Sequence, residues 1–516
     1  MTQTPQAVAP PASSPPAKVR RDLFNTDYLK SDLKGRSVRG GAIMVFSQGC
    51  RFVLQTGSTV VLARLLTPAD FGLIAMVAAV TNFAILFKDL GLSDATIQKG
   101  GINHGQISTL FWINSGLGLF ISVIIVSLAP VVAWFYDDPR LTPVTMVLGS
   151  TFVFGGLAVQ HQAMLRRHMR FFAIGLVDIV SMSVGVAAAI TAALLGAGYW
   201  SLIIMHMAIA IATTVGIWIA CPWLPGLPRR AVGVKKMLAF GSNLTAFSIV
   251  NYFARNADNI LIGKFIGAAA LGFYSKAYGL LMLPIRQLRS PLVSVGLPGL
   301  SRLQDDAERF KNYYLKMVQL LAFTCIPMAL LLAVHSDRVI VLVLGQQWEA
   351  AASIFRILAF AAVIQPLVST YGMIMISSGH AHRYFKLGVM TSTVYVISFV
   401  LGLPWGATGV ALSYTVANYV LLIPILLYAF SGTSISVRDF FRVTLLPAVA
   451  AIFAAAASRA VLSLCSGFAA WLALLTALSA AGVFYVAVYS VMAGGRTTLR
   501  DIIQYAQLLL SRDKVV

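Results

Sequence analysis

The sequence predicts an all-α polytopic membrane protein with about fourteen transmembrane helices. Of its 516 residues, 58% are hydrophobic and only 11% are charged, whereas a soluble domain carries about 25% charged residues. The mean hydropathy is +0.81. Apolar runs of about 20 residues, the length that crosses a bilayer, recur along the chain. This composition excludes a secreted disulfide scaffold, a soluble enzyme with a small anchor, and a disordered chain.

Residues 1–39 are predicted to form a disordered, basic, cytoplasmic tail. An uncharged Pro/Ala/Ser stretch precedes the charges, and no apolar core follows within the segment. A signal peptide has the opposite order, so this tail is not expected to be one.

From Gly40 onward, apolar runs alternate with short polar breaks. The fourteen predicted spans are residues 40–63, 72–92, 107–133, 142–161, 173–195, 199–221, 237–263, 272–297, 313–335, 351–376, 385–404, 407–430, 441–462 and 468–492. Gly196-Ala197-Gly198 separates the fifth span from the sixth and predicts a tight helical hairpin. The breaks are too short to hold an extramembrane catalytic domain.

The basic residues predict the orientation of the chain. With a cytoplasmic N-terminus, 30 of the 39 Lys and Arg residues fall in cytoplasmic segments and six fall in outer ones. This asymmetry follows the positive-inside rule. It also accounts for most of the net charge of +21 without a nucleic-acid partner.

Two segments repeat at a constant offset of 200 residues. Residues 60–66 followed by Phe71-Gly72-Leu73 match residues 260–266 followed by Leu271-Gly272-Phe273. Further on, residues 169–172 are similar to residues 382–385, and the Gly196 turn is similar to Gly406-Ala407-Thr408-Gly409. Each unit holds six spans, so both have the same orientation. Parallel repeats are typical of transporters with a substrate site between the halves.

The repeat gives the expected domain organisation. After the tail, an N-lobe at 40–221 and a C-lobe at 237–430 are joined by a cytoplasmic linker at 222–236. Two more helices follow at 441–492. Residues 493–516 place apolar side chains at helical spacing, which predicts an amphipathic helix on the cytoplasmic membrane surface.

No cofactor or metal is expected. The four cysteines lie in or beside separate apolar runs, without a CxxC motif or a Cys/His cluster. The sequence has no Walker A motif, so ATP is not expected to be the direct energy source.

Several stretches carry a resemblance to a known family. They are residues 62–72, 88–93, 162–171, 257–263, 271–274 and 297–303. Through them the chain resembles the Wzx-type lipid-linked oligosaccharide flippases, the polysaccharide-transporter branch of the multidrug/oligosaccharidyl-lipid/polysaccharide exporter superfamily. The likeness covers roughly residues 35–495, and the N-terminal tail lies outside it.

This resemblance implies two pseudo-symmetric six-helix lobes around a central cavity that opens alternately to each side of the bacterial inner membrane. It implies undecaprenyl-diphosphate-linked oligosaccharide as the substrate, moved from the cytoplasmic to the periplasmic leaflet. The last two helices exceed the twelve of the two lobes, so their role stays open.

Polar faces on the spans that begin the two repeats mark the expected cavity. Ionised residues within a bilayer are costly, so they should face water or a partner. The cavity candidates for substrate binding are Gln48, Arg51, Gln55, Asn251, Arg255, Asn259 and Arg356. Because a guanidinium group matches phosphate oxygens in a bidentate manner, Arg51 and Arg255 are predicted to bind the diphosphate. The alternative is that each Arg pairs with a carboxylate, for example Arg255 with Asp258, and fixes helix packing.

Asp178 and Asp258 are the candidates for coupling transport to a proton or Na⁺. A buried carboxylate takes up a proton more readily, because desolvation disfavours its charge. The alternative is an ion pair with a basic residue on a neighbouring helix. His206 is a further candidate for a functional residue within the membrane, and the alternative is that it is packed and hydrogen-bonded. Lys276 is near the outer end of its span and is expected to snorkel to the outer surface.

Arg166, Arg167 and Arg170 form a basic cluster at the predicted cytoplasmic face. They could collect anionic lipid headgroups or the diphosphate. The alternative is that they only determine topology.

Three functions are compatible with this reading. The first is a flippase rather than an enzyme, serving exopolysaccharide or lipopolysaccharide biosynthesis with membrane lipids and polymerase or export machinery as partners. The second is a small-molecule cation antiporter of the same superfamily, which would place carboxylates rather than arginines in its cavity. The third is a membrane polymerase or ligase, which would need a larger outer loop.

Overall fold

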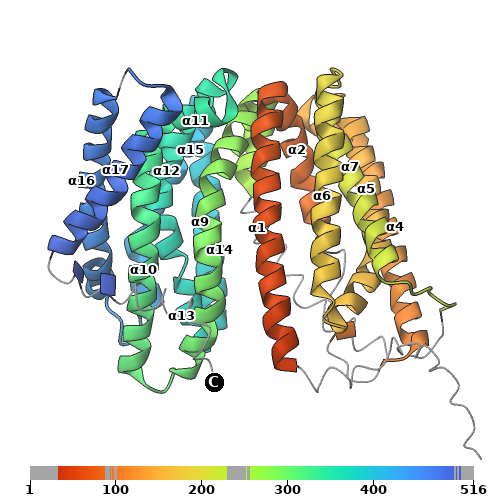
Figure 1. The fold of residues 1–516 in the computed structure, drawn as a ribbon, viewed down its shortest axis with the longest axis horizontal. Helices are drawn as coiled ribbons and strands as arrows, with labels where there is room; N and C mark the ends of the chain where they lie inside the picture. Colours follow the sequence, from red (N-terminus) through yellow and green to blue (C-terminus); the bar gives the residue numbers. More distant parts are fainter. Residues whose placement is uncertain are drawn as a thin grey trace, which may run out of the picture.

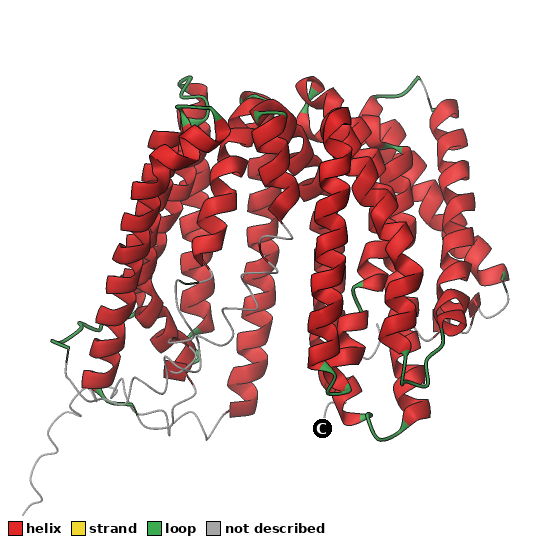
Figure 2. Ribbon diagram, turned by 180° about the vertical axis from the view of Figure 1, so that it is seen from behind, coloured by secondary structure: helices red, strands yellow, loops and turns green. Residues whose placement is uncertain are grey.

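The computed structural model describes residues 33–85, 102–228, 256–465 and 467–492, together with residues 87, 93, 96–97, 252, 495–496 and 499–500. Within these residues the secondary structure is entirely helical (Figure 2). The amphipathic helix expected at 493–516 lies almost wholly outside this part of the chain, as does the beginning of the tail.

In the described part of the chain, six helices of defined bounds form the first half of the molecule. They are α1 (Leu33–Leu65), α2 (Pro68–Ile85), α4 (His104–Tyr136), α5 (Leu141–Arg167), α6 (Phe171–Leu194) and α7 (Trp200–Ala220). A helical segment at 256–265 precedes the second half.

The second half contains the remaining helices. They are α9 (Ala268–Arg302), α10 (Ala307–Val334), α11 (Ser336–Leu344), η2 (Gln346–Trp348), α12 (Glu349–Val368), α13 (Tyr371–Ser377), α14 (Ala381–Gly402), η3 (Leu403–Trp405), α15 (Gly406–Phe430), α16 (Val437–Leu464) and α17 (Ala470–Val491).

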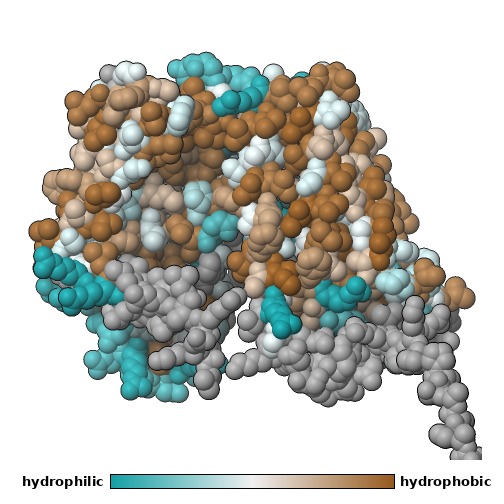
Figure 3. All heavy atoms as spheres, in the orientation of Figure 1, coloured by the Kyte–Doolittle hydropathy of each residue, from teal (hydrophilic) through white to brown (hydrophobic). Residues whose placement is uncertain are grey.

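The helices match most of the predicted spans, and they are generally longer. Eleven helical stretches in the described ranges are long and apolar enough to cross a membrane. Most of the predicted span at 237–263 lies outside the described residues. The span predicted at 351–376 is divided into α12 and α13 by Ser369 and Thr370. Hydrophobic residues cover the middle of the face in Figure 3, and hydrophilic ones gather toward its ends, as a membrane-spanning surface requires.

The two halves meet at one end and diverge toward the other (Figures 1 and 2). The joined end contains residues 62–72, 262–272 and 342–348. The open end contains the start of α1, the α5–α6 turn and the α15–α16 turn. A hydrophobic core from both halves, including Leu62, Phe71, Tyr274 and Phe355, closes the joined end.

Glycines from the two repeats make the closest contact between the halves. A Cβ on Gly72 in α2 would overlap the backbone of Ala268, and a Cβ on Gly272 in α9 would overlap the backbone of Pro68. The two glycines are 200 residues apart, at matching positions in the repeat. The internal repeat therefore has a structural counterpart: α2 and α9 cross with the same residue type at the same place.

The other matched positions also occupy equivalent places. At the start of α6, the Arg170 guanidinium donates to the Ala220 carbonyl at the end of α7, at 2.9 Å. At the start of α14, Arg383 donates to the carbonyls of Tyr428 and Ser431 near the end of α15, at 2.7 and 2.9 Å. Each arginine thus satisfies helix C-terminal carbonyls that have no partner within their own helix.

The helix turns in these two pairs use glycine in the left-handed region. Gly196 and Gly198 have φ of 80° and 54°, and Gly406 has φ of 69°. A residue with a Cβ adopts such angles at a cost, so glycine suits the reversal. The tight hairpin predicted at 196–198 is confirmed.

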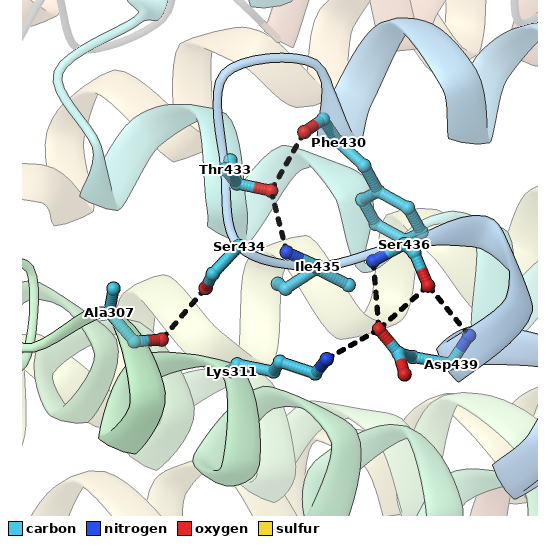
Figure 4. A network of polar contacts seen from close by, with 8 residues as sticks. All are labelled: Ala307, Lys311, Phe430, Thr433, Ser434, Ile435, Ser436 and Asp439. Atoms are coloured by element: carbon cyan, nitrogen blue, oxygen red, sulfur yellow. Dashed lines mark hydrogen bonds and ion pairs between the residues drawn. The ribbon is translucent and has the colours of Figure 1, made fainter.

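A polar network fixes the start of α16 to α10 at the open end (Figure 4). Lys311 in α10 pairs with Asp439 at 2.7 Å, and Asp439 also accepts the Ser436 hydroxyl at 2.7 Å. Ser436 and Asp439 form a capping box at the start of α16. Ser434 adds a bond to the Ala307 carbonyl at 2.7 Å. These contacts therefore hold the α16–α17 pair against α10.

Candidate functional site

A first cavity of about 630 Å³ lies between the two halves. Its walls come from α1, α2 and α7 on one side and from α9 on the other. Its polar lining residues are Gln48, Arg51, Gln55, Thr56, Ser58, Thr59, His206, Ser275, Lys276, Arg286, Gln287 and Ser290. No Asp or Glu occurs among the described residues of the lining, so the chamber is positively charged.

The polar face predicted on the first span supplies one wall of this cavity. Gln48, Arg51 and Gln55 follow each other at helical spacing and line it together. The structure therefore brings these three candidates to one surface of α1.

Arg51 also pairs with the other candidate, Asp178 in α6. The guanidinium Nη1 lies 3.1 Å from Oδ2 of the carboxylate, and the two side chains are 48% and 22% exposed. The pair is thus partly exposed rather than fully buried. Asp178 itself is outside the cavity lining, so Arg51 keeps one side toward Asp178 and another toward the chamber.

Lys276 and His206 lie nearer the joined end of the cavity. Lys276 Nζ is 3.9 Å from the centroid of the Phe71 ring, a cation–π contact. Its position eight residues into α9 puts it about 12 Å below the joined end. Lys276 therefore faces the chamber, and the predicted snorkelling to the outer surface is wrong.

Arg286 lines the first cavity but is not among the predicted site residues. It lies eighteen residues into α9, about 27 Å from the joined end, and Arg51 lies about 21 Å from that end in α1. Arg51 and Arg286 therefore line one chamber from helices of different halves, at depths that differ by about 6 Å. The signal was available in the sequence, because Arg286 falls within the predicted span at 272–297.

A second cavity of about 660 Å³ lies within the second half. It is enclosed by the 256–259 helical segment, α9, the α12–α13 break, α14 and α15. Tyrosines and amides dominate its polar lining. Ser275, Gly279 and Arg286 of α9 line both cavities, so this helix is the wall that they share.

Asp258 and Asn259, two predicted site residues, line this second cavity. Asp258 is 8% exposed and accepts the Tyr274 hydroxyl at 2.9 Å and the Asn259 backbone N–H at 2.8 Å. These hydrogen bonds hold the carboxylate in place. The structure thus separates the two carboxylate candidates, with Asp178 beside the first cavity and Asp258 in the second.

Three predicted cavity residues are not found in either lining. Asn251 and Arg255 lie outside the described residues, so the proposed Arg255–Asp258 pair has no structural account here. Arg356 faces away from both cavities: it pairs with Asp337 in α11 and donates to the Ser336 hydroxyl at 3.0 Å. Gln365, nine residues further along α12, reaches the second cavity instead.

The basic cluster at the end of α5 makes several structural contacts. Arg167 is buried and donates to the Thr96 carbonyl at 2.9 Å, and Arg170 holds the end of α7. Arg166 is exposed. Of the three headgroup candidates, Arg166 and Arg170 are exposed and Arg167 is buried.

Bonds from the second half hold the end of α1 and close the joined end. Trp348 Nε1 donates to the Ala63 carbonyl at 2.7 Å, and Gln347 Nε2 donates to the Leu66 carbonyl at 3.0 Å. In the reverse direction, Arg64 donates to a backbone carbonyl of α11 at 2.6 Å. These side chains donate hydrogen bonds to carbonyls near helix ends, which have no partner within their own helix.

The repeat partner of Arg64 makes a corresponding contact. Lys264 Nζ pairs with Asp137, at the end of α4, at 2.7 Å. In each repeat, a basic residue thus contacts the opposite half of the molecule. We call the bonds of Arg64, Lys264, Gln347 and Trp348 the seam.

Comparison with known proteins agrees with this architecture. The chain is 26% identical over 367 residues to the lipopolysaccharide biosynthesis protein WzxC of Escherichia coli strain K12, covering 70% of this chain and 74% of that protein. It is 26% identical over 345 residues to the teichuronic acid biosynthesis protein TuaB of Bacillus subtilis strain 168, covering 66% and 71%.

The fold is shared with a solved membrane transporter. The structure of the lipid II flippase MurJ in an inward closed conformation superposes with a TM-score of 0.69, at 13% identity, over 90% of this chain and 100% of that one. The chain is thus a multi-pass membrane protein with a transporter fold. The family model for polysaccharide biosynthesis proteins matches residues 61–353, more than half of the chain. The chain therefore belongs to the polysaccharide biosynthesis protein family.

Proposed function

We propose that this protein is a flippase that moves undecaprenyl-diphosphate-linked oligosaccharides across the bacterial inner membrane by alternating access. The observation that carries the proposal is the first cavity, which lies between the halves and holds four basic side chains without a carboxylate in its described lining. The named roles of its relatives in lipopolysaccharide and teichuronic acid biosynthesis support a lipid-linked sugar as cargo. The fold likeness to a lipid II flippase supports the same mode of transport.

The diphosphate would bind between Arg51 and Arg286. Both residues line this cavity from helices of different halves, and each guanidinium group can donate two parallel hydrogen bonds to phosphate oxygens. On arrival the diphosphate competes with Asp178 for Arg51, which requires little free energy because that ion pair is partly exposed. Lys276 and His206 would form a second site for the diphosphate, nearer the joined end.

The lobes at 40–221 and 237–430 would rock about the α2–α9 crossing. In this arrangement the open end faces the cytoplasm, with the N- and C-termini on that side, and the seam closes the periplasmic side. The exposed Arg166 would attract anionic headgroups at the cytoplasmic surface. Asp258 is the favoured coupling site for a proton or Na⁺, because it is buried in the second cavity, whereas Asp178 is partly exposed and pairs with Arg51.

A small-molecule cation antiporter is disfavoured by the same cavity. A cationic substrate would be repelled by a chamber that contains Arg51, Lys276 and Arg286. A polymerase or ligase is disfavoured by the short connections between the described helices.

The test is complementation of a strain in which the gene has been deleted. Arg51→Gln and Arg286→Gln should each reduce polysaccharide export at least about tenfold, because each removes a charged hydrogen-bonding group from the diphosphate. Lipid-linked sugar should accumulate in the cytoplasmic leaflet. Arg302→Gln is the matched control, since Arg302 lies in the same helix as Arg286 and lines neither cavity. Normal export by both cavity variants, at wild-type membrane levels, would overturn the proposal.

A further inference from the structure

The second cavity is lined mainly by phenol and amide groups, and its charged lining residues are Asp258, Arg286 and Arg289. Five of its lining residues are tyrosines: Tyr278, Tyr371, Tyr384, Tyr395 and Tyr414. Four are amides: Asn256, Asn259, Gln365 and Asn418. We propose that this cavity binds the saccharide of the substrate while the first cavity holds its diphosphate, an inference that rests on the proposed function.

The chemistry of the two linings differs in the way that these ligands differ. A diphosphate accepts hydrogen bonds and carries charge, so it favours cationic donors. A sugar hydroxyl both donates and accepts, and so do phenol and amide groups. The apolar C–H faces of sugar rings also pack on aromatic rings, which are rigid and bury a large area. The undecaprenyl chain, in contrast, would leave these polar groups without partners.

Gln365 shows where a hydroxyl would fit. Its Nε2 donates to the Tyr414 hydroxyl at 2.9 Å, which orients the amide. Its Oε1 is buried and accepts no hydrogen bond from the described residues. A buried acceptor without a donor is costly and uncommon. A sugar hydroxyl in the cavity would satisfy this oxygen.

The position of α9 lets one substrate occupy both cavities. Ser275, Gly279 and Arg286 belong to both linings, and a Cβ built at Gly279 would meet no heavy atom within 4 Å. A diphosphate at Arg286 therefore lies where the adjoining saccharide can extend into the second half. The volumes of about 630 and 660 Å³ are each within the usual range for a ligand site.

Two variants test whether the saccharide and the diphosphate bind in different cavities, and neither variant changes a basic residue. Gly388 lines the second cavity in α14, and a Cβ there would meet no heavy atom within 4 Å. Gly388→Leu should therefore fold and fill the cavity, since leucine also favours the helix. Gln365→Leu removes the unpaired acceptor. Gly482→Leu in α17 is the matched control, because Gly482 is equally open and lies outside both linings.

Binding is measured with the full-length protein in nanodiscs and two probes. One is undecaprenyl diphosphate without sugar, and the other is the lipid-linked saccharide fraction extracted from the deletion strain. Gly388→Leu and Gln365→Leu should weaken binding of the saccharide probe at least about tenfold and leave that of undecaprenyl diphosphate within about twofold. Retained binding of the sugar-free probe also shows that each variant is folded.

The outcomes separate this inference from the proposed function. If the wild-type protein binds neither probe, the proposed function and the inference both fail. If it binds both, but the two variants weaken both probes equally or neither, the proposed function stands and the division between cavities is wrong. A loss that occurs equally in Gly482→Leu would likewise contradict it.

Discussion

The two halves of the molecule are alike where they meet and different in their interiors. Gly72 and Gly272 make equivalent crossings, and Arg170 and Arg383 hold equivalent helix ends. Inside the first half, α4 and α5 approach so closely that a Cβ on Gly156 would crowd the Asn114 backbone at 2.7 Å. Inside the second half, the helices enclose a cavity of about 660 Å³. The contacts of assembly thus recur in both halves, and side chains of the second half line the second cavity.

The largest effect is expected from the glycine crossing. Gly72→Leu and Gly272→Leu would each force a side chain into the backbone of the opposite half, at a cost of at least about 3 kcal/mol. For both variants, the monodisperse peak on size-exclusion chromatography in detergent should be lost. Gly482→Leu should elute normally. If one glycine tolerates leucine and the other does not, the crossing is less symmetric than the repeat implies.

The seam should give the next effect, on conformation rather than folding. Replacing Gln347 and Trp348 by Ala and Phe removes bonds to the end of α1 and should favour opening of the joined end by about 1–3 kcal/mol. Spin labels on α1 and α11, measured by double electron–electron resonance, should report a longer distance. An unchanged distance distribution in a membrane would show that the hydrophobic core alone keeps this end closed.

The matched arginines allow a finer comparison of the halves. Arg383 donates to two carbonyls and Arg170 to one, so Arg383→Gln should cost about 1–2 kcal/mol of stability and Arg170→Gln less. Thermal unfolding in detergent measures both. Equal losses would indicate that the number of bonds does not set the stability of these helix pairs. Arg166→Gln is the control, since Arg166 is exposed beside Arg170.

The smallest effect concerns two neighbouring carboxylates in the α4–α5 turn. Asp138 accepts hydrogen bonds from the Arg140 side chain, which lower its pKa, whereas Asp137 pairs with Lys264 across the seam. The stabilisation by Asp138 is complete above its unfolded-state pKa of about 3.9 and is lost as the pH falls through the lowered value. Asp138→Asn should reduce stability at pH 7 by less than about 1 kcal/mol. Melting temperatures at pH 7 and pH 3 check this, and a larger loss at pH 3 than at pH 7 would contradict it.

The sequence determined the fold class, most of the spans and the repeat, because these depend on local composition and periodicity. Twenty apolar residues cross a bilayer wherever they lie in the chain, and a polar face such as that of Gln48, Arg51 and Gln55 is visible from helical spacing alone. The matched glycines and arginines of the repeat were also visible before their contacts were known.

Only the tertiary structure decided which polar residues share a chamber. Arg356 and Gln365 lie in one helix, yet the first pairs with Asp337 and the second lines a cavity. Nine residues make two and a half turns of an α-helix, so the two side chains lie on opposite faces. Arg51 could be read from the sequence as a phosphate ligand or as half of an ion pair. Its contacts with both Asp178 and the cavity depend on how α1, α6 and α9 pack, and no local pattern specifies contacts between helices so distant in sequence.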